Sequence, residues 1–326
     1  MRVCIVGAGA IGGWIGARLA ASGVEVSALA RGATLDALRA QGWRLRTADG
    51  LVTGPARASD DPRELGAHDL VIVAVKGQSL PALAPSLVPL IGADTCVLPA
   101  MNGVPWWFCA GIPGVGDLPL TSVDPGGAIT ASIPFERVLG CVVHASAAVA
   151  EPGVVQHRMG QGIIVGEPKG GRSARAQAVV DLLGAAGFET THSDDIRRDA
   201  WFKLWGNLTM NPVSAITGAS ADRILADPLV RAFCSRAMAE AAEIGARIGC
   251  PIAITPEERH AVTAKLGAFR TSMLQDAEAG RPIELDAIVG AVAEIGARVG
   301  VATPNVEALM GLTRLFGRVR GLYPED

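Results

Sequence analysis

The chain has 326 residues, a length that suggests about two domains. Its 29 Lys and Arg residues nearly balance its 32 Asp and Glu residues, and no block of like charge occurs. These features exclude a nucleic acid held by phosphate contacts and a basic helix on a membrane surface, and an apolar content of 49% excludes intrinsic disorder.

Two uncharged stretches, Val3–Ala17 and Thr95–Gly116, invite comparison with a signal peptide and a membrane span. Five glycines interrupt the first stretch and three prolines the second, which argues against both interpretations. The six cysteines form no CxxC pair and the five histidines are scattered, so we expect no metal site. We predict a protein of the reducing cytoplasm with no membrane partner.

A glycine-rich turn follows the first predicted strand, Arg2–Val6. The next six residues fit the pattern G-x-G-x-x-G, namely Gly7, Ala8, Gly9, Ala10, Ile11 and Gly12. The sequence then predicts a helix of small residues over Ile11–Ser22 and a second strand over Val24–Ala30. This order of strand, turn, helix and strand is the context in which the pattern binds a dinucleotide.

Each glycine of the turn has a physical reason. Gly7 allows a tight turn, Gly9 lets the backbone approach a pyrophosphate, and Gly12 lets helix and strand pack closely. The following helix N-terminus adds N–H donors and the positive end of the helix dipole. We therefore predict that this turn binds a dinucleotide, with a chance match in a glycine-rich chain as the alternative.

The end of the second strand bears on the choice between NAD and NADP. An NAD site usually has Asp or Glu there, which accepts a hydrogen bond from the ribose 2′-OH. This strand ends instead in Ala30 and Arg31, and Glu25 lies too far upstream. The guanidinium of Arg31 suits a 2′-phosphate, so NADP is favoured. The alternative is that Arg31 is a solvated surface residue.

Two further strands lead to polar residues. The strongest strand pattern, Asp69–Val75, ends just before Lys76, and the strand Thr95–Leu98 leads to Asn102. Open α/β sheets bind ligands at the carboxyl ends of their strands, so we expect both residues at the ligand-binding edge. Further strands are predicted within Val138–Val149, Gly162–Val165 and Phe188–Thr191, with a helix near Ala174–Ala186.

The C-terminal part of the chain is helical by its pattern, which predicts an α/β domain at 1–194 and a helical domain at 195–326. Lys203, Asn207 and Asn211 are four residues apart and so share one face of a helix whose other residues are mostly apolar. These polar groups would be costly to bury without partners. The residues alone leave two interpretations open, a solvated stripe and the lining of a ligand site.

The later helices are predicted at Leu229–Ile248, Pro256–Ala279, Ile283–Val299 and Val306–Val319. Ser272 lies in the second of these helices, and Glu284 lies in the first turn of the third. A carboxylate is favourable in the first turn of any helix. Position alone therefore marks neither residue as functional.

Taken together, these segments resemble the ketopantoate reductase family (2-dehydropantoate 2-reductases) over nearly the whole chain. The matching segments are GAGAIG from Gly7, Arg31, VAVKGQ around Lys76, NG at Asn102, KLWGNLTMNPVSAITG from Lys203, TSMLQD from Thr271, IELDAIVG around Glu284 and TPN from Thr303. The glycine pattern is generic, but K-x-x-x-N-x-x-x-N-P followed by S-M-L-Q-D and E-L-D is highly specific.

The resemblance implies an α/β fold with an N-terminal Rossmann-type doubly wound, mostly parallel sheet and a C-terminal all-helical domain. It implies a 2-oxo acid as the small-molecule substrate, reduced with NADPH in a cleft between the domains. The simplest such reaction is the reduction of 2-dehydropantoate to pantoate in pantothenate biosynthesis. The resemblance also suggests a homodimer formed through the helical domain.

The resemblance assigns roles position by position. The proton donor is Lys203. The substrate contacts are Asn102, Asn207, Asn211 and Ser272. The cofactor contacts, besides the glycine turn, are Arg31, Lys76, Asn102 and Glu284. An ammonium suits the donor role because hydride delivery to a ketone leaves negative charge on oxygen. The flanking Trp201 and Trp205 are expected to desolvate Lys203 and lower its pKa.

Two departures from the family pattern leave the substrate open. Ten residues after Asn211 the family often has another substrate-contacting asparagine, whereas this chain has Ala221. The long connection at 103–137 carries Trp106 and Trp107, which either roof the site over a bulkier acid or fill an inserted loop. The alternatives are therefore a paralogous reductase of a bulkier oxo acid and a non-catalytic NADPH-binding regulator.

Overall fold

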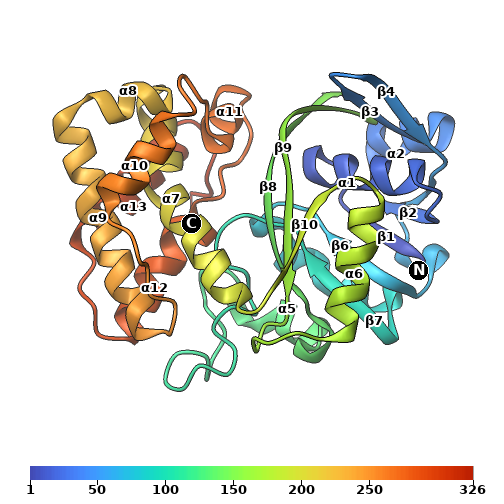
Figure 1. Ribbon diagram of the computed structural model, residues 1–326, viewed down its shortest axis with the longest axis horizontal. Coiled ribbons are helices and arrows are strands. Elements are labelled where there is room, and N and C mark those ends of the chain that lie inside the picture. The colour runs from blue at the N-terminus through green and yellow to red at the C-terminus, as the bar shows by residue number, and fades with distance from the viewer. Residues whose placement is uncertain (326) are drawn as a thin grey trace. The chain divides into compact units, whose positions relative to one another are not determined.

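A parallel sheet of five strands organises the N-terminal part of the computed structural model, which describes residues 1–325 (Figure 1). In spatial order the strands are β5 (Arg57–Ser59), β2 (Val26–Leu29), β1 (Val3–Val6), β6 (His68–Val73) and β7 (Ile91–Pro99). All neighbouring pairs are parallel. The chain passes from β1 to β2 on one side and later to β6 on the other. The strand order therefore reverses beside β1, where open α/β sheets bind ligands.

Helices connect the strands of this sheet. They are α1 (Ala10–Ala21), α2 (Gly32–Gln41), α3 (Pro62–Leu65) and α4 (Leu80–Leu83), with the 3-10 turns η1 (Gly77–Ser79) and η2 (Ala84–Leu90). The predicted unit of strand, turn, helix and strand is present, with its bounds shifted by one or two residues. The Rossmann-type parallel sheet expected from the sequence is confirmed.

A second, mixed sheet packs in the same region. Its strands are β10 (Glu189–Ser193), β9 (Val154–Gly166), β3 (Trp43–Thr47) and β4 (Gly50–Gly54), and β8 (Gly140–Glu151) forms a long antiparallel hairpin with β9 (Figure 1). Helix α6 (Ala174–Ala185) joins β9 to β10. Strand β3 was not predicted from the sequence, although its alternation buries Trp43 and Leu45 and exposes Arg46.

Helix α1 contacts strands of both sheets, and small residues permit this close approach. A Cβ on Gly13 would lie 2.5 Å from Val155 Cγ2. A Cβ on Gly16 would lie 2.6 Å from the Trp43 ring. Trp14 of the same helix is fully buried. The glycine-rich composition thus lets one helix pack against two sheets.

The C-terminal part of the chain is helical. Its helices are α7 (Ile196–Thr217), α8 (Ala221–Ala226), α9 (Pro228–Arg247), α10 (Pro256–Ala264), α11 (Ser272–Glu278), α12 (Ala291–Arg298) and α13 (Pro304–Val319), with a π-helical turn η5 (Asp286–Gly290) before α12. The single helix predicted at Pro256–Ala279 is wrong. Gly267, with a φ of +61°, follows the end of α10, and the Thr271 side chain caps a new helix by accepting a hydrogen bond from the Leu274 N–H.

The contacts within the chain divide it into two compact units. The first consists of Met1–Met101 and Gly127–Asp199, and the second of Asn102–Gly126 and the chain from Ala200 onward. The predicted division after residue 194 kept 102–126 with the α/β domain, whereas the contacts group it with the helices. The remaining short elements are η3 (Pro125–Gly127), α5 (Ala128–Ser132) and η4 (Phe135–Arg137).

Two charged residues of α12 hold the segment 102–126 in the second unit. The Glu294 carboxylate accepts hydrogen bonds from the backbone N–H groups of Thr121 and Ser122, both at 2.9 Å. The Arg298 guanidinium donates to three carbonyl oxygens of the segment, those of Val115, Leu118 and Pro119. Glu294 and Arg298 also pair with each other at 2.7 Å. This pair makes the segment part of the helical unit.

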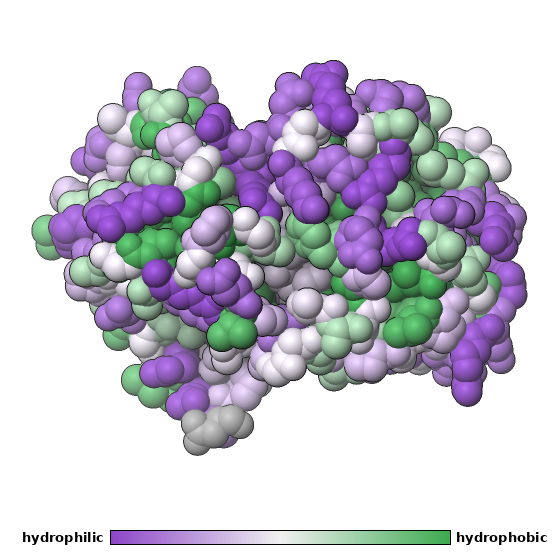
Figure 2. All heavy atoms as spheres, turned by 90° about the horizontal axis from the view of Figure 1, so that it is seen from below, coloured by the Kyte–Doolittle hydropathy of each residue, from purple (hydrophilic) through white to green (hydrophobic). Residues whose placement is uncertain are grey.

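None of the helices within residues 1–325 combines the length and the apolar character that a membrane span requires. On the face of the molecule that Figure 2 shows, hydrophobic patches are small and separated by hydrophilic residues. Within the same described residues, no group of His, Cys, Asp or Glu side chains is arranged to hold a metal ion.

Candidate active site

The glycine turn between β1 and α1 leaves room for a ligand. Gly7 has a φ of +91°, and a Cβ there would lie 2.6 Å from Val75 Cγ1. A Cβ on Gly12 would collide with the Gly7 carbonyl oxygen, whereas the space around a Cβ on Gly9 is empty to 4 Å. Glycine is therefore required at positions 7 and 12 by packing, and Gly9 leaves the backbone open to an approaching phosphate.

The N-terminus of α1 is suited to bind an anion. Gly9 is the N-cap residue, no side chain caps the helix, and its first turn has no acidic residue. The first N–H groups of a helix have no partner within the helix, and they lie at the positive end of its dipole. The residues Gly7–Gly12 therefore fit the diphosphate of a dinucleotide.

Basic residues follow the strands on both sides of β1. Arg31 follows β2 as the exposed N-cap residue of α2, whose first turn also lacks acidic residues. Lys76 follows β6 and is the N-cap residue of η1. The register aligns Val6 with Leu29 and with Val73, so these two cations flank the glycine turn along one edge of the sheet. This edge suits a ligand that carries several phosphates.

In the second unit, one face of α7 carries the predicted polar stripe. Lys203 is half-buried, and its Nζ donates a hydrogen bond of 3.0 Å to Asn102 Oδ1. Asn207 is half-buried and Asn211 is buried. At 1.5 Å of rise per residue the stripe is about 12 Å long. The structure thus joins Asn102 to the lysine end of a continuous polar face.

Two tryptophans anchor the opposite side of α7. The indole N–H of Trp201 donates to the Ala241 carbonyl oxygen at 3.2 Å, and that of Trp205 to the Met238 carbonyl oxygen at 2.7 Å. Each tryptophan is two residues from Lys203, which is about 200° around the helix. The rings therefore do not flank the amine as expected from the sequence; they fix α7 on α9.

Ser272 lies beside the far end of the stripe. The Ser214 hydroxyl, three residues after Asn211 on α7, is hydrogen-bonded to the Thr271 hydroxyl at 2.6 Å, and both groups are buried. Thr271 is the N-cap residue of α11, and Ser272 is the first residue of that helix and is exposed. This hydroxyl pair places the N-terminus of α11, where Ser272 lies, against α7 at Ser214, about one helical turn after Asn211.

The segment after Glu284 packs against the turn that carries Asn102. The Val104 N–H donates to the Ala287 carbonyl oxygen at 2.7 Å. A Cβ on Gly103 would lie 2.5 Å from that same oxygen. Ala287 lies in the π-helical turn η5, and π-turns are frequent at functional sites. The structure therefore groups Asn102, Lys203 and the Glu284 segment in the second unit.

The tryptophans of the inserted segment are interior residues. Trp106 is 6% exposed and Trp107 is 1% exposed. The neighbouring Phe108 stacks on Trp201 with ring centroids 5.7 Å apart. Of the two interpretations that the sequence left open, filling of the inserted loop agrees with this burial. The burial of these rings does not support the other interpretation, in which they cover the substrate site.

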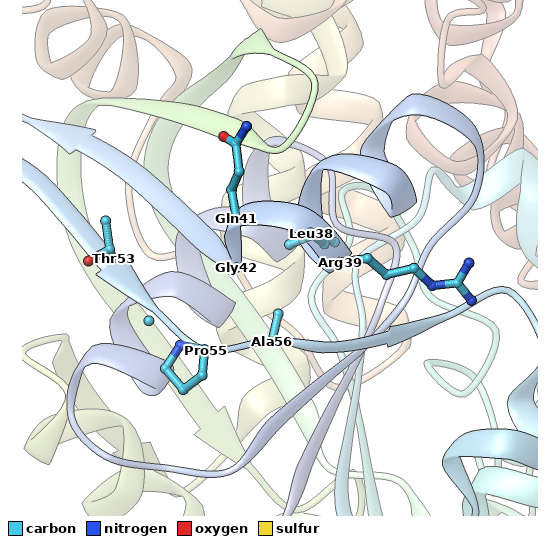
Figure 3. A pocket seen from close by; sticks show the side chains of 8 residues that line it. Leu38, Arg39, Gln41, Gly42, Thr53, Pro55 and Ala56 are labelled. Atoms are coloured by element: carbon cyan, nitrogen blue, oxygen red, sulfur yellow. The ribbon is translucent and has the colours of Figure 1, made fainter.

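A hollow of about 550 Å³ in the first unit does not coincide with the predicted site (Figure 3). It lies between the end of α2 and the connection from β4 to β5, and its lining residues are Leu38, Arg39, Gln41, Gly42, Thr53, Gly54, Pro55 and Ala56. The Arg39 guanidinium points away from it in Figure 3 and donates to the Ala58 carbonyl oxygen. Because Arg31 caps the N-terminus of α2 at the ligand-binding edge of the sheet, the C-terminal end of α2 lies away from that edge.

Some residues that hold the elements of the site in place were not predicted from the sequence. They are Ser214, Thr271, Ala287, Glu294 and Arg298. The capping pattern at Thr271 was a usable signal for a helix start there. The other contacts join residues far apart in the chain, so no local pattern indicates them.

The first unit supplies a glycine turn flanked by cations, and the second a lysine–amide face. These features define the class of the protein, an oxidoreductase that uses a nicotinamide dinucleotide. Residues 3–107 match the family described as Ketopantoate reductase PanE/ApbA, and residues 195–316 match Ketopantoate reductase PanE/ApbA C terminal. The chain belongs to the ketopantoate reductase family.

Relatives cover the chain along its whole length. A 2-dehydropantoate 2-reductase of Mesorhizobium japonicum is 42% identical over 99% of this chain and 100% of its own. A solved structure from Ralstonia solanacearum MolK2, assigned as a ketopantoate reductase, is 55% identical and covers 99% of both chains with a TM-score of 0.95. The 2-dehydropantoate 2-reductase of Geobacter metallireducens GS-15 is 28% identical, with a TM-score of 0.84 over 97% of this chain and 100% of its own.

Proposed function

We propose that this protein reduces 2-dehydropantoate to pantoate with NADPH and that Lys203 donates the proton. The observation that carries the proposal is the 3.0 Å hydrogen bond from Lys203 Nζ to Asn102 Oδ1, on a face that also bears Asn207 and Asn211. The names of the full-length relatives, 2-dehydropantoate 2-reductases, support the substrate.

Lys203 acts on the oxygen of the reacting carbonyl. NADPH, when bound, would supply the hydride that adds to the C2 carbon of the acid, and the former carbonyl π electrons would then reside on the oxygen. The Lys203 ammonium stabilises this charge and gives the oxygen a proton, which yields the 2-hydroxy acid; the neutral amine then regains a proton from water. A positioned acid of this kind contributes about 10²–10⁴-fold to the rate. The amide oxygen of Asn102 accepts one N–H of the ammonium and so fixes the position of Nζ.

The neutral residues of the stripe orient the substrate. The Asn207 and Asn211 amides each offer two N–H donors and one oxygen acceptor. They bind hydroxyl and carboxylate oxygens without competing for the transferred proton, because a side-chain amide neither gains nor loses a proton near neutral pH. Ser272, exposed at the start of α11, adds a hydroxyl donor at the far end of the stripe.

The residues of the first unit select the cofactor. The Gly7–Gly12 turn binds the diphosphate through backbone N–H groups. Arg31 binds the 2′-phosphate, because a planar guanidinium donates two parallel hydrogen bonds to a phosphate. Lys76 adds a positive charge on the other side of the turn. Glu284 and Asn102 complete the cofactor site in our proposal.

The experiment that tests this function is a panel of 2-oxo acids, each assayed for oxidation of NADPH and of NADH. We expect the highest kcat/KM with 2-dehydropantoate and NADPH. A higher kcat/KM with a bulkier acid would show that the bulkier acid is the substrate, and the proposed type of reaction would still hold. NADPH binding without turnover of any acid would contradict an enzymatic role and favour the regulator interpretation.

One observation favours a second substrate within the same reaction class. Ala221 occupies the position where the family often has a substrate-contacting asparagine. It is 1% exposed, and its N–H donates to the Phe269 carbonyl oxygen at 2.9 Å. This position therefore offers a substrate no polar side chain. An acid with fewer hydroxyl groups than 2-dehydropantoate would lose less binding energy from the absence of a polar side chain at position 221.

The homodimer and the cytoplasmic location stay predictions. Light scattering of the purified protein measures the oligomeric state, and a monomer at micromolar concentration would contradict the first prediction. Fractionation of the source cells tests the second.

A further inference from the structure

The chain turns sharply where α13 ends. Gly321 has a φ of +65°, and its N–H donates to the Arg318 carbonyl oxygen at 3.0 Å. The Leu322 N–H donates to the Gly317 carbonyl oxygen at 2.7 Å. These two bonds form a Schellman motif, in which a glycine in the left-handed conformation ends a helix. The motif therefore fixes the direction in which the chain leaves α13.

Two hydrogen bonds join the residues after this turn to the chain at and just before η5. The Ile283 N–H donates to the Leu322 carbonyl oxygen at 3.0 Å. The hydroxyl of Tyr323, the one tyrosine of the chain, donates to Asp286 Oδ1 at 2.7 Å. A Cβ on Gly317 would lie 2.7 Å from Tyr323 Cβ, so the absence of a side chain there lets the tyrosine lie against α13. The segment that leads into η5 is thus held at two points.

The Tyr323 phenol supports a half-buried carboxylate. Burial raises the pKa of Asp286, and the hydrogen bond from Tyr323 and the charge of Arg314 counteract this. Burial and the bond to Asp286 raise the pKa of Tyr323 to about 12, so the phenol keeps its proton and remains a donor near neutral pH. A buried carboxylate that loses its donor bears the cost of its desolvation without compensation. Removal of the phenol oxygen therefore favours a different position of the Asp286 side chain.

The residue that follows Asp286 contacts the segment with Asn102. The Ala287 carbonyl oxygen accepts the 2.7 Å hydrogen bond from the Val104 N–H. Two residues earlier, the Asn102 side-chain oxygen accepts from Lys203 Nζ at 3.0 Å. These contacts form a continuous path from the phenol to the proposed proton donor, and every residue of the path belongs to the second unit.

We propose that Tyr323 is a positioning residue of the reaction, which holds η5 against the turn of Asn102 and so sets the position of the Lys203 ammonium. The proposal rests on the proposed function, because it concerns the same proton donor. Tyr323 acts through Asp286 and Ala287 and needs no contact with substrate or cofactor. Loss of its hydroxyl therefore lowers the rate of proton donation more than it weakens binding of the acid to the rest of the polar stripe.

Tyr323→Phe is the central variant, because it removes one oxygen and keeps the ring. We expect kcat for 2-dehydropantoate to fall by about 10- to 100-fold, the effect of a displacement of up to about 1 Å, with a smaller change in KM. Asp286→Asn keeps an oxygen acceptor for the phenol and is expected to retain most of kcat, whereas Asp286→Leu is expected to lower kcat as Tyr323→Phe does. An unchanged kcat in Tyr323→Phe overturns the proposal.

Ser235→Ala is the matched control. The Ser235 hydroxyl donates to Glu257 Oε1 at 3.0 Å, a bond between a hydroxyl and a carboxylate that joins α9 to α10 in the same unit. Its loss is expected to leave kcat unchanged. A fall in kcat equal to that of Tyr323→Phe would show that any such bond in this unit has the same effect, and it would overturn the positioning role.

A double-mutant cycle with Asn102→Ala separates positioning from general stability. Asn102→Ala removes the oxygen that fixes the Lys203 ammonium, so nothing remains there for the phenol to position. We expect Tyr323→Phe to lower kcat in the wild type and to have little further effect in Asn102→Ala. An equal fold-loss in both backgrounds shows that the two effects are independent, and it overturns the proposal.

Hydrogen exchange distinguishes failure of this proposal from failure of the proposed function, because it requires no substrate. We expect the Val104 amide, which is bound to Ala287, to exchange about 10-fold faster in Tyr323→Phe and at the wild-type rate in Ser235→Ala. If the wild type reduces no 2-oxo acid but Val104 exchange rises in Tyr323→Phe, the positioning contact stands and the proposed reaction fails. If Val104 exchange is unchanged in Tyr323→Phe, the Tyr323 proposal fails whatever the activity.

Discussion

The turn that presents Asn102 to Lys203 depends on glycine at position 103. Gly103 has a φ of +80°, and a Cβ there would lie 2.5 Å from the carbonyl oxygen of Ala287 and 2.6 Å from its carbonyl carbon. These atoms belong to the backbone of η5, and the Val104 N–H donates to the same oxygen at 2.7 Å. The backbone cannot rotate away from a new methyl group as a side chain would.

The expected cost of Gly103→Ala has two parts. The left-handed conformation costs alanine about 1–2 kcal/mol, and forcing a methyl group against backbone costs about 1–3 kcal/mol. We expect the free energy of unfolding to fall by about 2–5 kcal/mol. The turn can also relieve the clash by shifting, and Asn102 then moves away from Lys203. A displacement of about 1 Å is enough to lower kcat by about 10²-fold.

Gly111→Ala is the matched control in the same segment. Gly111 is exposed, has a φ of +76°, and has nothing within 4 Å of a new Cβ. It therefore carries the conformational cost alone, about 1–2 kcal/mol, and kcat is expected to stay unchanged. Urea unfolding and steady-state kinetics of both variants provide the comparison. If Gly103→Ala loses no more stability and no more activity than Gly111→Ala, the close approach to Ala287 does not position Asn102.

Two other predictions concern charged residues. Arg31→Asp is expected to raise KM for NADPH and lower KM for NADH, because the new carboxylate repels a 2′-phosphate and accepts from a 2′-OH; an unchanged ratio of the two KM values would show that Arg31 is only a surface residue. Burial raises the pKa of Glu294, but the hydrogen bonds from Ser122, Thr121 and Arg298 outweigh it and hold the pKa below its usual value of 4.5. A lowered folded pKa stabilises the protein above pH 4.5, and this contribution is lost as the pH falls through the folded value. Glu294→Gln should therefore destabilise the protein at neutral pH, and its difference from wild type in urea unfolding should shrink in acid; a constant difference would contradict this.

Local patterns predicted the elements on both sides of the glycine turn. From β1 through β2, short apolar runs and a helix of small residues are separated by glycines at the turns, so the sequence was sufficient to predict these elements. The polar stripe of α7 was predicted for the same reason, because positions four residues apart share a helix face whatever the tertiary structure.

Features that depend on distant residues were not predictable in this way. The segment 102–126 belongs with the helices because Glu294 and Arg298 bind its backbone, and these two residues look like an ordinary surface pair in the sequence. The prediction put the tryptophans of α7 beside the Lys203 amine. Their position depends instead on hydrogen bonds to α9, which a local pattern does not show.

The role of Lys203 is tested most directly by the rate of hydride transfer in a single turnover of Lys203→Ala, with Lys265→Ala as the control on an exposed lysine. With NADPH and 2-dehydropantoate both saturating, we predict a rate lower by about 10²–10⁴-fold in Lys203→Ala, unchanged affinity for NADPH, and a wild-type rate in Lys265→Ala. A wild-type rate in Lys203→Ala would contradict the assignment of Lys203 as the proton donor.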